Sequence, residues 1–323
     1  MTIPRIRIAN LPTPVEPLPR LSAALGGPRL WVKRDDLTGL AFGGNKTRKL
    51  EFVLAEAQAN GARTLITVGA AQSNHCRQTA AAAARLGLDC ILVLSGVPEN
   101  PPTGNLLLNH LFGAEIVWTT REEREATYQR TFEAAWTAGR RPYAIPLGAS
   151  NPIGTLAYEA AFQEWHAQVD TTGPLDWMVV ASSSGGTQAG LVLGARRAGW
   201  SGRVLGISID EQEDVLQARV AGLASEAADR LRLPLSFEPN DVLVNADYLG
   251  QGYGILGDPE REAIELFARY EGLLLDPVYT GRAAAGLIDL IRRGFFRPEE
   301  TVLFWHTGGG TALFAEKYHK VIS

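Results

Sequence analysis

A lysine that follows chain-breaking residues is the first feature of this sequence that could do chemistry. Gly43-Gly44-Asn45 precedes Lys46, and from Leu50 to Ala57 apolar residues recur with helical spacing. Glycine lets the backbone approach a ligand closely, so the amine of Lys46 need not point into solvent. Such a lysine suits a Schiff base with a carbonyl cofactor. The alternative is a solvated lysine in the first turn of a helix, because most lysines are exposed.

A turn rich in serine and glycine is the second such feature. Residues 182–190 read Ser-Ser-Ser-Gly-Gly-Thr-Gln-Ala-Gly; they follow the apolar run Trp177–Val180 and open a predicted helix. Converging N–H groups, close backbone approach and several hydroxyls predict a phosphate cradle at this helix start. The stretch lacks GxGxxG spacing and an acidic residue about twenty positions later on a matching strand, so a nicotinamide site is a poor fit.

Two further turns are polar. Gln72-Ser73-Asn74-His75 follows the apolar run Thr64–Val68, and either Ser73 or Asn74 could cap the alanine-rich helix that comes next. The same helix start could bind a carboxylate or a phosphate, so both interpretations stay open. His306-Thr307-Gly308 follows the last strand and would suit the far side of a cofactor ring. No His, Cys, Asp or Glu cluster has ligand spacing, so we expect no metal site and structural roles for the two histidines.

The lysine turn also resembles a nucleotide-binding P-loop. Gly39, Gly44, Lys46 and Thr47 nearly fit GxxxxGK[ST], but Asn45 intervenes and no apolar strand leads into Gly39. A lysine in a glycine turn, a separate phosphate cradle and no metal or dinucleotide signature together favour pyridoxal phosphate as the cofactor.

The elements that must position these turns are short apolar strands alternating with helices. This alternation indicates parallel βαβ units with helices on both faces of the sheets. We expect two α/β lobes with the site between them, at the carboxyl ends of the strands. The proline-rich residues 1–28 are expected to cover a surface rather than form a core. The sequence predicts strands at 29–34, 64–68, 90–94, 115–118, 143–146, 177–180, 204–208 and 301–305, and helices at 46–59, 74–86, 104–112, 121–138, 152–168, 187–198, 211–232, 258–270 and 281–293.

The bulk properties exclude several classes of protein. The 323 residues suit one large or two medium domains, and 46% hydrophobic with 20% charged residues is ordinary for a globular protein. A net charge of −4 offers no basic footprint for nucleic acid. No apolar run reaches the roughly 18 residues of a membrane span, and residues 1–10 lack the apolar core of a secretory signal. Cys76 and Cys90 lack CxxC spacing and are predicted to be buried free thiols. We expect a cytoplasmic protein.

Four stretches resemble one known family in the same order along nearly the whole chain. They are Lys33-Arg34-Asp35-Asp36, residues 43–51, residues 72–81 and residues 276–281. The sequence resembles the D-cysteine desulfhydrase and 1-aminocyclopropane-1-carboxylate (ACC) deaminase family, and D-cysteine desulfhydrase most of all. The resemblance implies the two-domain α/β fold type II of pyridoxal-phosphate enzymes, the tryptophan synthase β-like fold, with parallel twisted sheets flanked by helices. It also implies a large cofactor-binding domain of residues 1–48 and 158–323, a smaller α/β domain of residues 49–157, and a homodimer.

The resemblance also implies roles for individual residues. Lys46 matches the Schiff-base lysine, which also takes the α-proton. Ser73 matches the substrate carboxylate site in the turn that begins at Gln72, and Asn74 matches the residue that bonds the cofactor's 3′-oxygen. Two tyrosines, Tyr253 and Tyr279, match active-site tyrosines. The phosphate loop of the family matches Ser184, Gly185, Gly186 and Thr187.

Two positions bear on the substrate. Family members that deaminate ACC carry a glutamate directly after the second tyrosine and a leucine after the late histidine, whereas this chain has Thr280 and Thr307. A neutral hydroxyl beside the pyridine nitrogen makes the ring a weaker electron sink than a carboxylate does, which suffices when hydrosulfide is the leaving group. The resemblance therefore implies a lyase of amino-acid metabolism that converts D-cysteine to pyruvate, hydrogen sulfide and ammonia. The alternatives are ACC deaminase, which forms 2-oxobutanoate and ammonia, L-cysteate sulfo-lyase, and an inactive ligand-binding scaffold.

Overall fold

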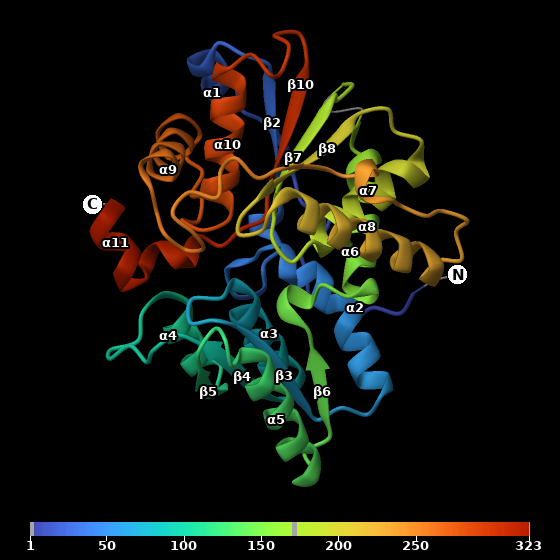
Figure 1. Cartoon of the computed structure of the whole chain (residues 1–323), viewed down its shortest axis with the longest axis vertical. Helices are drawn as coiled ribbons and strands as arrows, with labels where there is room; N and C mark the ends of the chain where they lie inside the picture. Colours follow the sequence, from blue (N-terminus) through green and yellow to red (C-terminus); the bar gives the residue numbers. More distant parts are fainter. Residues whose placement is uncertain (1–2, 170–172, 323) are drawn as a thin grey trace.

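Two sheets divide the molecule. The computed structural model describes residues 3–169 and 173–322 (Figure 1). The larger sheet has the order β1-β2-β10-β7-β8-β9, and all its neighbouring strands are parallel except β1 and β2. Its strands are β1 (Val15–Pro17), β2 (Arg29–Arg34), β7 (Trp177–Ser182), β8 (Arg203–Ser208), β9 (Leu243–Asn245) and β10 (Thr301–His306).

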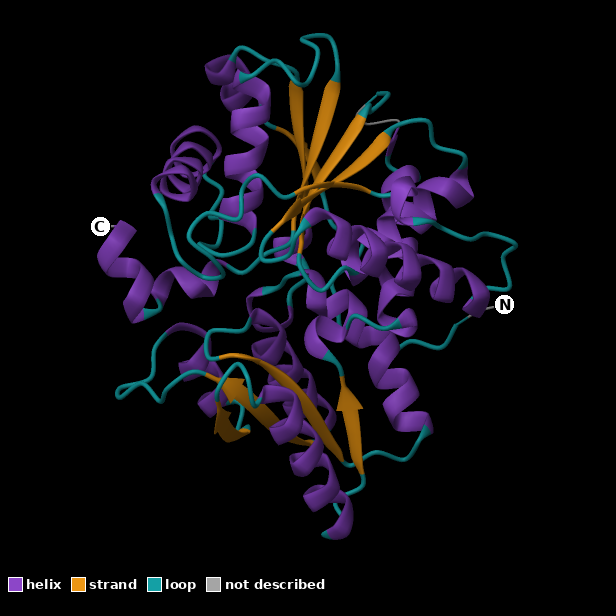
Figure 2. Ribbon diagram, in the orientation of Figure 1, coloured by secondary structure: helices purple, strands orange, loops and turns teal. Residues whose placement is uncertain are grey.

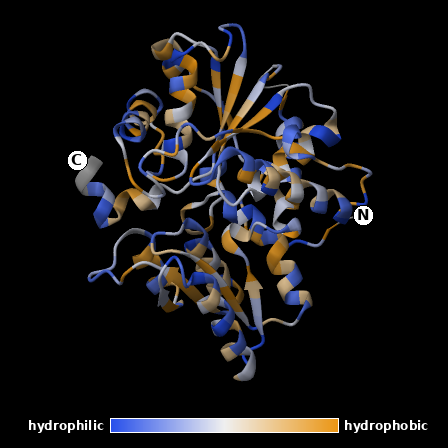
Figure 3. Ribbon diagram, viewed as in Figure 1, coloured by the Kyte–Doolittle hydropathy of each residue, from blue (hydrophilic) through white to orange (hydrophobic). Residues whose placement is uncertain are grey.

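The smaller sheet is entirely parallel and has the order β5-β4-β3-β6. Both faces of its central strands are buried, which explains why these strands read as continuous apolar runs (Figure 3). Its strands are β3 (Thr64–Ala70), β4 (Asp89–Ser95), β5 (Glu115–Thr119) and β6 (Pro142–Ile145).

Helices cover both faces of each sheet (Figure 2). On the large sheet, Met178 and Val180 of β7 pack against α6, α7 and α8, whereas Trp177 and Val179 pack against α1, α9 and α10. On the small sheet, α2, α3 and α4 cover one face and α5 covers the other. The helices are α1 (Pro19–Leu25), α2 (Asn45–Ala59), α3 (Asn74–Leu86), α4 (Gly104–Leu111), α5 (Arg124–Thr137), α6 (Pro152–His166), α7 (Gly186–Ala198), α8 (Glu213–Arg230), α9 (Asp258–Glu271), α10 (Thr280–Arg292) and α11 (Glu316–Ile322).

The alternating elements predicted from residue 29 onward are present, with ends that differ by at most a few residues. The expectation for residues 1–28 was wrong in part. This segment adds β1 to the edge of the large sheet and forms α1, and Leu18 and Leu21 are buried in the core beneath that helix. Apolar residues among prolines were too short a pattern to indicate an element.

The expected domain boundaries fall inside two helices. Position 48 lies in the first turns of α2, and position 158 lies within α6; the two helices contact each other and lead between the two sheets. The division into residues 1–48 with 158–323 and residues 49–157 stays a prediction, and the two separate sheets support it. In the described part of the chain, no helix is both long enough and apolar enough to cross a bilayer.

Candidate active site

A pocket lies where the carboxyl ends of both sheets meet. Its walls come from the residues after β7, β8 and β10 of the large sheet and from the ends of β3, β4 and β5 of the small sheet. Ligands of open parallel sheets gather at such ends. The lining includes Lys46, Ser73, Asn74, Ser95, Arg121, Arg124, Ser184, Gly185, Thr187, Asp210, Tyr253, Tyr279 and Thr307. Most of the predicted site residues are thus brought together.

Lys46 is the second residue of α2 and lies in the pocket wall, half-buried. Its Nζ donates a hydrogen bond to Oδ1 of Asn45 at 3.2 Å. Loss of water around the amine lowers the pKa of Lys46 to about 8, although the carboxylate of Asp276 acts in the opposite direction. A sizeable part of the amine is therefore uncharged, and nucleophilic, slightly above neutral pH.

The turn before Lys46 is closed by its own hydrogen bonds. Gly43 and Gly44 have φ values of 67° and 126°, which only glycine adopts readily. The N–H groups of Gly43, Gly44 and Asn45 donate to carbonyl oxygens of the protein at 3.0, 2.9 and 2.9 Å. A P-loop needs such N–H groups free for phosphate, so this geometry argues against nucleotide binding at the turn.

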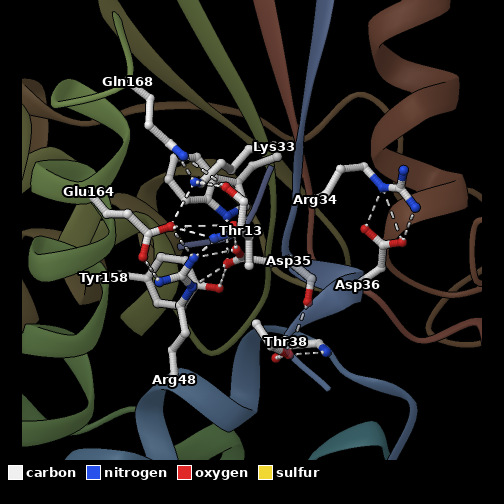
Figure 4. A network of polar contacts seen from close by, with 12 residues as sticks. Thr13, Lys33, Arg34, Asp35, Asp36, Thr38, Arg48, Tyr158, Glu164 and Gln168 are labelled. Carbon is white, nitrogen blue, oxygen red and sulfur yellow. Dashed lines mark hydrogen bonds and ion pairs between the residues drawn. The ribbon is translucent and has the colours of Figure 1, made fainter. Parts of the chain in front are cut away.

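A buried polar cluster holds α2 on the side away from the pocket (Figure 4). Arg48 donates to both oxygens of Asp35 at 2.9 and 2.8 Å and to both oxygens of Glu164 at 2.9 and 2.8 Å. Lys33 donates to Glu164 at 2.7 Å, and Tyr158 donates to Asp35 at 2.6 Å. Arg48 entered the sequence analysis only within residues 43–51, and its ion pairs were not predicted. We call Thr13, Lys33, Asp35, Arg48, Tyr158, Glu164 and Gln168 the Arg48 cluster.

Ser73 caps α3, which begins at Asn74. Its Oγ accepts a hydrogen bond from the N–H of Cys76 at 3.2 Å. A Cβ on Gly69 would lie 2.6 Å from this Oγ, so the glycine at the end of β3 lets the serine approach the strand. The first N–H groups of α3 have no carbonyl partner in their own helix. Donors of this kind at a helix start are suited to an anion.

The side chain of Asn74 is oriented by its neighbours. Its Oδ1 accepts hydrogen bonds from Arg77 at 2.9 Å and from Nδ2 of Asn105 at 2.8 Å, which leaves its Nδ2 as a donor. Gln72 is not in the pocket lining: its Oε1 accepts from the N–H of Asn105 at 2.8 Å, and its Nε2 donates to the carbonyl of Thr103 at 3.0 Å. Gln72 therefore secures the start of α4.

The serine–glycine turn connects β7 to α7 as predicted. Gly185 has a φ of 84°, and α7 begins at Gly186. The Oγ atoms of Ser184 and Ser150 lie 2.7 Å apart, and Ser150 also accepts from the N–H of Gly186 at 3.3 Å. Asn45 donates to the hydroxyl of Thr187 at 3.0 Å, which joins this cradle to the Lys46 turn.

Lys49 lies behind the cradle and was not predicted. Its Nζ donates to Ser150 Oγ at 3.0 Å and to the carbonyl of Gly148 at 3.2 Å. Burial, with the nearby charge of Lys46, lowers the pKa of Lys49 well below its ordinary value. A Cβ on Gly186 would lie 3.0 Å from this Nζ, so only glycine leaves the amine next to the start of α7. Its spacing of three residues from Lys46, which places both on one helix face, was the available signal.

Tyr253 and Tyr279 face each other in the pocket. Their hydroxyl oxygens lie 2.6 Å apart, and the ring centroids are 6.0 Å apart in an edge-to-face arrangement. Burial raises the pKa of Tyr253 to about 12 and raises the pKa of Tyr279 further above its ordinary value. Both phenols therefore keep their protons at neutral pH and can donate them.

Thr280 and Thr307 differ in their access to the pocket. Thr307 lines it directly after β10. Thr280, fully buried, begins α10 outside the pocket lining, and its hydroxyl donates to Asp276 at 2.7 Å. Asp276 also accepts from the N–H groups of Val278 and Tyr279, each at 3.0 Å. Its oxygens are thus occupied by donors of its own turn. The roles expected for the two threonines stay predictions.

The two histidines near the pocket are buried and neutral. His75 shares a hydrogen bond of 2.8 Å with the hydroxyl of Thr67, and burial lowers its pKa well below the ordinary value. His306 accepts from the N–H of Gly308 at 3.2 Å, and burial lowers its pKa too. Across residues 3–169 and 173–322, no three His, Cys, Asp or Glu side chains are grouped so that they could hold a metal ion.

Comparison with known proteins identifies the family. A model of the pyridoxal-phosphate dependent enzymes matches residues 6–308. The chain belongs to this family. A crystal structure of an ACC deaminase homologue is similar at 38% identity and a TM-score of 0.90, over 99% of this chain and 95% of that one. A crystal structure of an O-ureido-L-serine synthase mutant with bound O-ureido-L-serine shares the fold, at 16% identity and a TM-score of 0.68, over 93% and 88% of the two chains.

These findings confirm the resemblance to the ACC deaminase and D-cysteine desulfhydrase family, fold type II and the cofactor. The pocket of this pyridoxal-phosphate enzyme fits the group. Lys46 offers an amine with a lowered pKa. The start of α7 offers N–H groups, hydroxyls and the Lys49 amine in a cradle that a Cβ on Gly186 would fill. The roles of single residues stay predictions.

Proposed function

We propose that this pyridoxal-phosphate enzyme catalyses β-elimination from D-cysteine, forming pyruvate, hydrogen sulfide and ammonia. The observation that carries the proposal is one pocket that joins the Lys46 amine, an anion site at Ser73 and two protonated tyrosines. The position expected to govern the pyridine nitrogen is Thr280, a neutral hydroxyl, and Asp276 beside it is occupied by other donors. Neither residue presents a free carboxylate.

Lys46 is the proposed base. When bound, pyridoxal phosphate supplies an aldehyde that joins to an amine and a ring that takes up the electron pair released at the α-carbon. The Nζ of Lys46, once free, removes the α-proton, because its pKa of about 8 suits proton transfer near neutral pH. Asn45 holds this Nζ at 3.2 Å and thereby directs it into the pocket.

The start of α3 is the proposed substrate carboxylate site. The hydroxyl of Ser73 and the unpaired N–H groups of the first turn are donors suited to a carboxylate. Asn74 is proposed to donate from Nδ2 to the cofactor's 3′-oxygen, since its Oδ1 is already held by Arg77 and Asn105. Substrate and cofactor would then be held by adjacent residues of one helix.

The tyrosine pair is the proposed acid. As the C–S bond breaks, its electron pair leaves with sulfur, and Tyr253 or Tyr279 can give that sulfur a proton. Their shared hydrogen bond of 2.6 Å lets one phenol donate while the other stabilises the phenolate. Water then releases pyruvate and ammonia from the remaining three-carbon unit.

A panel of substrates tests the proposal. Purified holoenzyme is incubated separately with D-cysteine, L-cysteine, L-cysteate and ACC, and sulfide, sulfite and the 2-oxo acids are measured. We expect sulfide and pyruvate from D-cysteine. The alternative is ACC deamination, and the similar structure with 38% sequence identity, an ACC deaminase homologue, supports it. Formation of 2-oxobutanoate from ACC without sulfide from D-cysteine would establish that alternative.

The homodimer and the cytoplasmic location belong to this proposal as well. Large apolar side chains on neighbouring elements support an interface: Leu111 of α4 is 70% exposed and Phe314, in the short helical turn Gly310–Phe314, is 68% exposed. Light scattering should give twice the mass of one chain. A monomer at micromolar concentration would contradict the dimer.

A further inference from the structure

Two arginines that the reaction proposed above does not use also line the pocket. Arg121 precedes α5 and Arg124 begins it, directly after the carboxyl end of β5. Within the described chain, neither guanidinium has an ion pair with a carboxylate, whereas Arg219 on the facing wall is paired with Glu211 at 2.7 Å. The two arginines thus bring positive charge into the pocket that no acidic side chain neutralises at contact distance.

Their charges act on opposite walls of the pocket. Arg124 favours the thiolate of Cys76, although burial dominates and raises the pKa of that thiol to about 12. Cys76 donates its N–H to Ser73, so the charge of Arg124 also acts near the proposed carboxylate site. The charge of Arg121 favours the carboxylate form of Asp210, which follows β8. Burial raises the pKa of Asp210, and the positive charge of Arg121 opposes that shift. Both arginines line the same pocket as Ser73 and Asp210.

The spacing of the strands sets the scale of the distance between the arginines and the carboxylate site. Ser73 follows β3, the arginines follow β5, and β4 lies between them. Two strand spacings amount to roughly 10 Å. The strand between ends in Ser95, a small residue of the pocket lining. A long arginine side chain can cross most of this gap, and both arginines line the pocket that contains Ser73, so a substrate held at Ser73 is within reach of their guanidinium groups.

We propose that Arg121 and Arg124 form a subsite for an anionic sulfur group on the β-carbon of the substrate. The group is a thiolate, which takes a proton from the tyrosine pair as it leaves and departs as hydrosulfide, or a sulfonate, which leaves as sulfite. In both cases the C–S bond breaks, sulfur keeps the electron pair, and the guanidinium groups stay protonated beside the departing anion. The cyclopropane of ACC is uncharged and would gain nothing from this subsite. The inference rests on the proposed β-elimination and narrows its substrate class.

Binding of two matched ligands tests the subsite without turnover. 3-Sulfopropanoate and 3-(methylsulfonyl)propanoate have the same shape and lack an amine, but only the first carries a sulfonate charge. Titrated into holoenzyme, 3-sulfopropanoate should bind at least about tenfold more tightly, the size expected for a charge-assisted pair. Equal affinities in the unmodified enzyme would overturn the inference, whatever the variants show.

Variants assign the effect to the two arginines. Arg124→Gln and Arg121→Gln should each reduce the preference for the sulfonate, and Arg124→Lys should restore part of it. Arg130→Gln is the control, because Arg130 lies on the same helix outside the pocket and donates to Thr127. A preference unchanged in both glutamine variants, or reduced equally by Arg130→Gln, would overturn the assignment.

The substrate panel separates this inference from the proposed function. Sulfide or sulfite release that falls in Arg124→Gln in step with sulfonate binding supports both. A sulfonate preference that depends on Arg121 and Arg124, with no elimination from any sulfur amino acid, would sustain the subsite and overturn the reaction. Sulfide release from D-cysteine with no sulfonate preference would sustain the reaction and overturn the subsite.

Discussion

The cationic side chains on the two faces of α2 have different partners. Residues two positions apart on a helix point about 200° apart, so Arg48 and Lys46 face opposite sides. Arg48 is 3% exposed and donates to two carboxylates and to the hydroxyl of Thr13. Asp35, which it contacts, also accepts from the indole of Trp305 at 2.9 Å. Each charge in the Arg48 cluster is thus met by an opposite charge and by hydrogen bonds.

The pocket face leaves its cations with little support. Lys46 has one hydrogen bond to an amide, and Lys49 has two to neutral oxygens. The pKa of each amine is lowered, whereas the pKa of Arg48 is raised by its carboxylate partners. The same helix therefore holds charges for stability on one side and amines destabilised in their charged form on the other. We infer that the first face fixes the helix so that the second can hold reactive amines.

The contrast predicts opposite outcomes at the two positions. Lys46→Ala should lower kcat at least about 10³-fold, because the residue that joins the cofactor and moves the proton is gone. The free energy of unfolding of the cofactor-free protein should stay the same or rise, since a desolvated amine is removed. Product assays and urea unfolding measure the two effects. Lys46→Arg keeps the charge and should be equally inactive, so turnover by that variant would contradict the assignment.

Arg48→Met should instead lower the free energy of unfolding. It leaves Asp35 and Glu164 with buried charge and one fewer partner, which costs about 3–5 kcal/mol of stability. Arg196→Met is the matched control, because its ion pair with Asp241 is exposed and should contribute less than about 1 kcal/mol. Urea unfolding of both variants decides. Similar losses for the two would show that the Arg48 cluster does not anchor α2 as described.

The pH dependence of stability separates the faces further. The folded pKa of Lys46 is about 8 against an ordinary 10.5, so between these values the unfolded chain binds the proton that the folded chain has lost. Stability rises with pH in such a window. Lys46→Met should therefore stabilise the cofactor-free protein most below pH 8, by roughly 3 kcal/mol, and less as pH approaches 10.5. The stability lost in Arg48→Met should stay constant over this pH range, because the pKa of Arg48 is raised and its guanidinium does not titrate there. A constant difference for Lys46→Met would contradict the lowered pKa.

The sequence predicted the pocket face far better than the opposite one. Glycine spacing marked the Lys46 turn, and the run Ser184–Thr187 marked the cradle, because both signals are local. Arg48 depends on Asp35 and on Glu164, which lies 116 residues away, so no local pattern could show the pairing. Arg121 and Arg124 lie in a charged run that reads as a solvated helix start. Only the arrangement of β5 beside β4 places them at the pocket.

The fold shows the same division. Strands with continuous apolar runs were predicted to within a few residues, whereas β9, only three residues long, and β1 in a proline-rich segment were missed. Thr280 shows the limit for the site. Its position in the motif was clear, but its hydrogen bond to Asp276 and its place behind the pocket wall come from the path of the chain before α10. The residue type at this motif position therefore did not show whether the side chain lines the pocket.

The smallest effect tests whether the neutral oxygens around Lys49 matter to the cradle. Ser150→Ala removes the acceptor for Lys49 and Gly186 and the partner of Ser184, without changing any charge. One lost hydrogen bond is worth about 1 kcal/mol, so the affinity for pyridoxal phosphate should fall roughly fivefold. Ser22→Ala removes a comparable half-buried hydroxyl far from the pocket, bonded to Leu18 and Leu30, and should leave that affinity unchanged. If both variants bind the cofactor like the parent, the hydrogen bonds of Ser150 do not contribute to cofactor affinity, and the cradle does not need this neutral oxygen beside Lys49.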